Sequence, residues 1–148
     1  IAGYPGETEE EFRELLAFVR EMAFDRVGCF TFSPQSESPA AQEPGQVPEK
    51  IKRRRQRQLM EVAQQVSLIR NRAMAGREID VLVESAKAET QDGEVAGFVI
   101  GRSYRDAPEV DGVVLLKGEH APGDFVRARV TQALAYDVVA EPLPVPVA

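Results

Sequence analysis

The sequence predicts an α/β segment followed by a small all-β barrel. Within residues 1–33, an amphipathic helical pattern lies between two short apolar runs, which is the order of a strand–helix–strand unit. From Ile79 onward the hydrophobic period changes from helical to alternating, and turn signals separate five short runs. The chain has 148 residues, 43% hydrophobic and 28% charged, which suffices for one or two modest cores.

The first helix is marked by its start and by its apolar face. Residues 8–11, Thr-Glu-Glu-Glu, have the spacing of a capping box, so we expect a helix to begin at Thr8. Its apolar residues recur at helical spacing and predict one buried face: Phe12, Leu15, Leu16, Val19 and Ala23. Residues 26–33 are mostly apolar or small, which predicts a strand buried on both faces of a parallel sheet. Function in such units gathers at the carboxyl ends of strands, here residues 3–7 and 31–34.

A proline-rich loop and a long helix come next. Residues 33–48 hold four prolines and predict a loop, and a helical pattern then runs over 49–75 to Gly76. Its apolar stripe is interrupted near Arg55. The stripe consists of Ile51, Leu59, Val62, Ala63, Val66, Ile69 and Ala73. At about 1.5 Å per residue this helix would span roughly 40 Å, enough to link two domains.

The second half predicts five short strands. Their predicted ranges are 79–83, 95–100, 113–116, 125–130 and 136–139. This number fits a small barrel of the oligonucleotide/oligosaccharide-binding type. The segment 142–148 has a proline at every second position from 142 to 146 and is expected to be a loose tail. We therefore divide the chain into residues 1–75, 76–141 and 142–148.

The net charge of −6 is carried by the second half. Residues 1–75 carry 11 basic and 11 acidic side chains, whereas residues 76–148 carry 7 basic and 13 acidic ones. Such a domain repels phosphate backbones and favours a basic protein partner. Against this, residues 52–57 form a basic run, which is either a solvated helix face or a contact with RNA, the ribosome or another acidic surface.

Metal, disulfide and membrane chemistry are poorly supported. The single cysteine, Cys29, cannot form an internal disulfide or hold a cluster, and it is expected to be a core residue rather than a nucleophile. His120 stands alone in a turn, so no metal site is predicted. No apolar run approaches the roughly 18 residues of a spanning helix, so we expect a soluble cytoplasmic protein. Because the first residue is Ile1, we expect a piece of a longer chain.

Two segments are candidates for binding or chemistry. Residues 3–8 form a turn directly before a helix, where amides can cradle an anion or the edge of a ligand. Asp106, Glu109 and Asp111 lie on a loop that contains Pro108. Paired carboxylates can perform acid–base chemistry, but such spacing in an exposed loop is more often surface charge.

Taken together, these segments resemble the methylthiotransferases of the radical S-adenosylmethionine superfamily. Residues 1–12 look like a late strand and helix of that family's barrel, and residues 24–34 with 38–41 look like its last strand and exit loop. The second half is similar to the family's small C-terminal TRAM barrel. Residues 101–112 resemble the branch that modifies a ribosomal protein, and their Asp-Ala-Pro-Glu-Val-Asp-Gly segment is the most specific feature. The resemblance covers residues 1–141.

The resemblance implies a fold, a reaction and two sites. Residues 1–75 would be the end of a radical S-adenosylmethionine α/β barrel with a linking helix, and residues 76–141 a five-stranded TRAM barrel. The full-length transferase would convert an aspartate of small-subunit ribosomal protein S-twelve to its methylthio derivative, with S-adenosylmethionine and two 4Fe-4S clusters. The cofactor-side residues would be Tyr4, Pro5, Gly6, Glu7, Thr31, Phe32 and Ser33. The substrate-binding residues would be Arg102, Tyr104, Asp106, Glu109 and Asp111.

One departure from the family is plain. The Cys-x3-Cys-x2-Cys motif and the other cluster cysteines of the family are not in this sequence, so the chain alone is expected to be inactive and no catalytic residue is assigned. Two other functions remain open. One is an RNA-binding module of a tRNA methylthiotransferase, for which Phe98, Tyr104, Phe125 and Tyr136 are the evident stacking aromatics. The other is a purely structural domain that braces the barrel.

Overall fold

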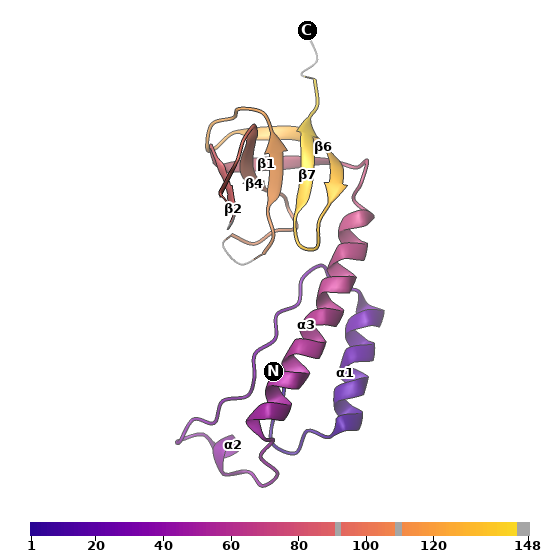
Figure 1. Cartoon of the computed structure of the whole chain (residues 1–148), viewed down its shortest axis with the longest axis vertical. Helices are drawn as coiled ribbons and strands as arrows, with labels where there is room; N and C mark the ends of the chain where they lie inside the picture. The colour runs from indigo at the N-terminus through magenta and orange to yellow at the C-terminus, as the bar shows by residue number, and fades with distance from the viewer. Residues whose placement is uncertain (91–92, 109–110, 145–148) are drawn as a thin grey trace. The chain divides into compact units, whose positions relative to one another are not determined.

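The computed structural model describes residues 1–90, 93–108 and 111–144, and the chain divides into two compact units, 1–67 and 68–148. Figure 1 shows helices in the first part of the chain and a closed barrel of five strands in the second. The order of helices followed by a small barrel is therefore as predicted. Helix α3 (Glu49–Arg72) contains the boundary between the two units.

Helix α1 (Glu9–Met22) begins where the sequence predicts. Thr8 Oγ1 accepts a hydrogen bond from the Glu11 amide at 3.2 Å, and the Glu11 carboxylate accepts one from the Thr8 amide at 2.7 Å. These bonds from Thr8 lower the pKa of Glu11 below its ordinary value. Phe12 and Val19 are buried, and the other predicted members of the face are partly buried. The capping box and the buried face are thus confirmed.

The predicted strand over residues 26–33 is largely absent. Ala2 and Thr31 form an isolated parallel bridge, in which the Ala2 amide donates to Phe30 O and the Phe32 amide donates to Ala2 O, both at 2.8 Å. Cys29 is buried, but Phe30 is 77% exposed. The prediction that both faces of residues 26–33 are buried is therefore wrong, because only the side that faces α1 and α3 is covered. The α/β barrel implied by the resemblance is not seen among the described residues.

Helix α3 is shorter and less regularly apolar than predicted. It ends at Arg72, and the amides of Met74 and Ala75 bond three residues back, to Asn71 O at 2.9 Å and Arg72 O at 3.2 Å. Of the predicted stripe, Leu59, Val62, Ala63 and Val66 are buried. Ile69 is 64% exposed, whereas Lys52 and Arg55 are buried within unit 1. The preceding loop also contains one short helix, α2 (Pro39–Gln42), which was not predicted.

The barrel has the predicted number of strands. They are β1 (Glu78–Ser85), β4 (Phe98–Arg102), β5 (Val114–Lys117), β6 (Phe125–Ala133) and β7 (Val138–Pro142). The closed order is β1-β4-β5-β7-β6, and only the β5–β7 pair is parallel. Inward-facing aliphatic residues fill the centre, among them Val81, Val99, Val114, Leu116 and Val130. Closure leaves these strands without free edges.

A two-stranded hairpin next to the barrel was missed. Strands β2 (Ala88–Thr90) and β3 (Gly93–Val95) pair with each other in antiparallel register. The sequence suggested one strand over 95–100, but Gly97, with a φ of +79°, ends that run before β4 begins. The turn at Gly97 therefore lies within the run that the sequence predicts as one strand.

The end of β7 extends into the segment expected to be loose. Pro142 is the last residue of β7 and pairs with Ala128, and the Leu143 amide donates to Arg127 O at 2.9 Å. A proline is tolerated at this end because the position needs no further ladder amide. Residues 145–148 of the predicted tail lie outside the described residues. No helix in the described part of the chain is long and apolar enough to cross a bilayer.

Candidate functional site

The two segments predicted on the cofactor side lie together in unit 1. The Ala2–Thr31 bridge lies just before residues 4–7 and brings them close to residues 31–33. The Tyr4 and Phe32 rings meet edge to face with centroids 5.3 Å apart. An open depression of about 350 Å³ lies beside Tyr4, which is 50% exposed. The depression is lined by Tyr4, Pro5, Gly6, Glu7 and Glu11.

The amides of this turn are engaged within the chain. Gly3 N donates to the Glu7 carboxylate, Gly6 N to Gly45 O at 2.9 Å, and Glu7 N to Tyr4 O at 3.0 Å. These donors do not form the free amide cradle that the sequence suggested. The depression instead offers a ligand the side chains of Tyr4 and Pro5.

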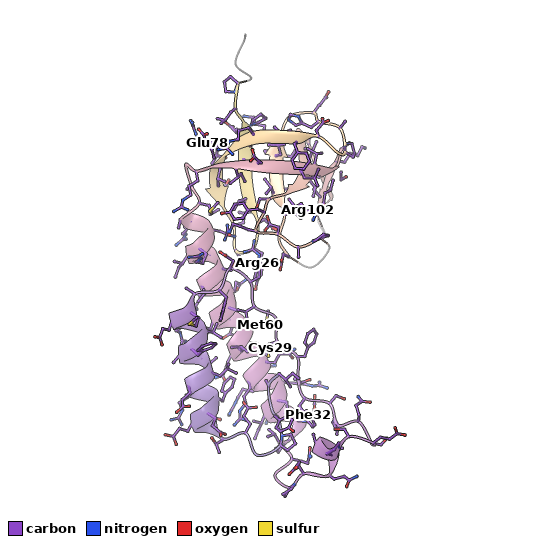
Figure 2. The ribbon with its side chains drawn as sticks, turned by 180° about the vertical axis from the view of Figure 1, so that it is seen from behind. Arg26, Cys29, Phe32, Met60, Glu78 and Arg102 are labelled. Carbon is purple, nitrogen blue, oxygen red and sulfur yellow. The ribbon has the colours of Figure 1, made fainter. Side chains whose placement is uncertain are left out.

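Buried cations of α3 hold the same segments from the other side. Lys52 Nζ donates to Phe32 O at 2.9 Å and lies 5.1 Å from the centroid of the Phe32 ring. Arg55 Nη1 donates to Glu7 O at 3.0 Å and lies 3.4 Å from Glu7 Oε1. Lys52 and Arg55 are 5% and 4% exposed (Figure 2 labels Phe32, the partner of Lys52). Lys52 and Arg55 therefore position the segments that contain Phe32 and Glu7.

The basic run 52–57 is divided between two environments, because Lys52 and Arg55 are buried whereas Arg53, Arg54 and Arg57 are exposed. Its buried members, Lys52 and Arg55, cannot reach an external ligand. The exposed members Arg53 and Arg54 pair with Glu49 and Glu9, at 2.9 and 2.8 Å. The sequence contains one signal of this burial. The apolar stripe marks the buried face of the helix, and Arg55 interrupts that stripe.

Unit 1 does not fit an iron–sulfur cluster. Cys29 is 7% exposed, and burial raises the pKa of its thiol. Its Sγ lies 3.7 Å from Phe30 O within the core. The described ranges contain no group of three or more His, Cys, Asp or Glu side chains that could hold a metal ion. Cys29 therefore behaves as the core residue that the sequence predicts.

A second cavity lies on the outside of the barrel. It has a volume of about 270 Å³ and is lined by Asp80, Leu82, Arg102, Ser103, Tyr104 and Phe125. The strand register places Leu82 between Arg102 of β4 and Phe125 of β6. Tyr104 and Phe125 are 82% and 77% exposed. Of the predicted substrate residues that the structure describes, only Arg102 and Tyr104 line this cavity. Sequence spacing missed its other members because strands distant in sequence bring them together.

Ion pairs neutralise the outer face of these strands. Arg102 Nε lies 2.8 Å from Glu84 Oε1, and Arg127 Nη1 lies 3.1 Å from Asp80 Oδ1. Further along, the Arg129 guanidinium donates to Glu78 at 2.8 Å and, with help from Arg127, holds the pKa of that carboxyl below its ordinary value. Each pair joins one acidic and one basic side chain, so the excess of acidic side chains in the barrel comes from residues outside these pairs.

Most of the predicted loop carboxylates shape the loop itself. Asp106 Oδ2 accepts from Ser103 N at 3.1 Å and from Ser103 Oγ at 2.7 Å, and Asp111 Oδ2 accepts from Ala107 N at 2.9 Å. These are the local bonds by which aspartate stabilises turns. Glu109 lies outside the described residues. The structure does not bring Asp106 and Asp111 to the cavity, and it gives them no acid–base geometry.

Comparison with known proteins gives a consistent result. The family model of the TRAM domain matches residues 75–143. A protein of Roseiflexus sp. (strain RS-1) named ribosomal protein uS12 methylthiotransferase RimO is 49% identical over 146 residues, 99% of this chain and 30% of that protein. Proteins of the same name from Roseiflexus castenholzii and from Synechococcus sp. (strain JA-2-3B'a(2-13)) are 50% and 45% identical over 93% and 99% of the chain. The chain spans about 30% of the length of these relatives.

Proposed function

This chain is a homologue of RimO methylthiotransferases along nearly its whole length and contains a TRAM domain, and we propose that it is part of an enzyme that methylthiolates ribosomal protein uS12. The observation that carries the proposal is 45–50% identity over 93–99% of the chain to proteins of that name. The acceptor is an aspartate of uS12, and the enzyme works in the cytoplasm beside its ribosomal substrate.

The full-length enzyme uses S-adenosylmethionine and two 4Fe-4S clusters. S-adenosylmethionine supplies the methyl group and the radical when bound. In this chain the residues suited to its edge are Tyr4, Pro5, Gly6, Glu7, Thr31, Phe32 and Ser33, and the half-exposed Tyr4 ring beside the open depression supports that assignment. The described residues hold no group of three or more side chains that could bind a metal ion, which supports the proposal that the chain alone is inactive.

The barrel recognises uS12 as a basic protein. Support comes from the excess of acidic over basic side chains in residues 76–148, 13 against 7, and from the exposed cavity beside Arg102 and Tyr104. Asp106, Glu109 and Asp111 add negative charge on the adjoining loop. The alternative is an RNA-binding module of a tRNA methylthiotransferase, and the exposure of Tyr104 and Phe125 favours it, because such rings can stack on bases.

Mass spectrometry of uS12 from cells with and without the gene for this protein tests the proposal. We expect the methylthio-aspartate only where the gene is present. A methylthio group that disappears from tRNA rather than from uS12 when the gene is removed would support the alternative and overturn the proposal.

A further inference from the structure

The barrel cavity combines apolar rings, an aliphatic floor and a carboxylate. We propose that it receives a lysine or arginine side chain of uS12, which packs its stem on Leu82 and Phe125 and directs its charge to Asp80 and the face of Tyr104. This inference rests on the proposed function in taking uS12 as the partner. It adds the part of the barrel that makes the contact and the kind of side chain that is bound.

The geometry of three neighbouring strands carries the inference. Leu82 of β1 is directly opposite Arg102 on one side and Phe125 on the other, so the three side chains form one row across the barrel. Tyr104 follows two residues after Arg102, and Asp80 precedes Leu82 by two residues on the same strand face. The result is a row in which Leu82 and Phe125 supply apolar surface, Arg102 lies at one end, and the Asp80 carboxylate lies beside Leu82.

This mixed lining matches an amphipathic cation. Lysine and arginine bury their methylene stems on apolar surface while the charged head stays near water or a counter-charge. Aromatic ring faces attract such heads, and both rings here are more than three-quarters exposed. The Asp80 side chain is 67% exposed, so its carboxylate is accessible to a second cation besides Arg127.

The same lining is unfavourable for a phosphate backbone. Arg102, which lines the cavity, and Arg127, which pairs with the lining residue Asp80, face carboxylates of Glu84 and Asp80 at 2.8 and 3.1 Å. A phosphate would have to displace these carboxylates and would approach a domain that carries six more acidic than basic side chains. The cavity therefore favours a basic protein over RNA as the partner of this barrel.

Titration calorimetry of the full 148-residue chain with purified uS12 at low salt tests the inference. The double variant Tyr104→Ala/Phe125→Ala is compared with Phe30→Ala, a matched control because Phe30 is also 77% exposed but lies in unit 1. We expect about a tenfold loss of affinity in the double variant and less than about a twofold change in the control. Asp80→Asn is expected to weaken binding as well, and unchanged thermal unfolding of each variant shows that the fold is retained.

The outcomes of this titration distinguish failure of the inference from failure of the proposed function. If the unaltered chain binds uS12 and the double variant binds equally well, the cavity is not the contact, and the proposed function stands. If the unaltered chain does not bind uS12, recognition of this protein by the barrel fails, and the inference fails with it. A double variant that loses affinity for RNA but not for uS12 assigns the rings to stacking and overturns the inference.

Discussion

Lys52 donates from its ammonium group to the main-chain carbonyl of Phe32 at 2.9 Å, from a position only 5% exposed. The same group lies over the Phe32 ring, and one turn further along the helix Gln56 donates to Cys29 O at 2.8 Å. Helix α3 thus holds the segment before and after Thr31 through side chains that reach its backbone. In unit 1, side chains of this helix therefore donate to main-chain carbonyls that would accept from a neighbouring strand in a sheet.

Replacing Arg55 by methionine is expected to destabilise unit 1. The change leaves the Glu7 carboxylate, only 13% exposed, without the guanidinium beside it, and breaking a buried pair in this way costs about 3–5 kcal/mol. Urea unfolding followed by circular dichroism measures the loss. Arg53→Met is the control, because Arg53 is 70% exposed in its pair with Glu49 and such pairs contribute about 0.5 kcal/mol. Equal stability of the two variants would contradict the positioning role.

Gly3→Ala is expected to lower the stability of the same unit by about 1–3 kcal/mol. Gly3 has a φ of +77°, and a Cβ at this position would collide with the stem of Lys52. Gly28→Ala is the matched control, because its Cβ would meet no atom within 4 Å and its φ is not positive. A shared melting temperature for the two alanine variants would argue against close packing between Gly3 and Lys52.

The outcome for these residues shows what periodicity can and cannot predict. The start of α1 followed from Thr8 and Glu11, because capping is a local interaction within four residues. Closure of a five-stranded barrel followed from alternation and turn signals. The burial of Lys52 and Arg55 did not follow, because their partners, Phe32 and Glu7, are distant in sequence and charge is normally read as exposure.

The barrel cavity escaped prediction for a related reason. Its members Leu82, Arg102 and Phe125 become neighbours only through the register of three strands, and register depends on the whole barrel. Loop carboxylates such as Asp106 are conspicuous in the sequence, but composition alone does not distinguish a turn-forming aspartate from a ligand-binding one. Of the predicted substrate residues, Arg102 and Tyr104 line the cavity, whereas Asp106 and Asp111 bond within their own loop.

The stability of the barrel is expected to depend on pH through Glu78. Hydrogen bonding from Arg129 lowers the pKa of Glu78 below its ordinary value of 4.5, so its stabilising effect is present above that value and is lost as the pH falls through the lowered pKa. Glu78→Gln should therefore reduce stability more at about pH 7 than at about pH 3, as measured by thermal unfolding. The exposed Glu119, changed to glutamine, serves as the control. An equal loss from Glu78→Gln at both pH values would exclude this linkage.

Removing the loop charges is expected to weaken capture of uS12. We predict this for Asp106→Asn, Glu109→Gln and Asp111→Asn combined in the full-length enzyme, with cleavage of S-adenosylmethionine unimpaired. The amide side chains retain an oxygen that can accept the turn bonds of Asp106 and Asp111, so the variant changes mainly charge. Each exposed charge contributes about 0.2–1 kcal/mol, and the effect should shrink as salt rises. Unchanged affinity at low salt would reduce the loop to a structural turn.

The chain as given is expected to bind no iron–sulfur cluster. Cys29 is its single thiol and is buried, so a four-iron cluster lacks ligands. Anaerobic reconstitution with iron and sulfide, followed by visible absorption, should give no charge-transfer band after desalting. Cys29→Ser is the control, and a stoichiometric cluster in the unaltered chain that this variant loses would falsify the prediction.

Parallel titration of the chain with purified uS12 and with tRNA, over a series of salt concentrations, tests most directly the claim that this barrel serves a protein substrate. The net charge of −6 and the paired arginines of the outer strands predict tighter binding to uS12 at low salt, with an affinity that falls as salt rises. Tighter binding to tRNA, with the steep salt dependence of released counterions, would contradict it and assign the barrel to RNA.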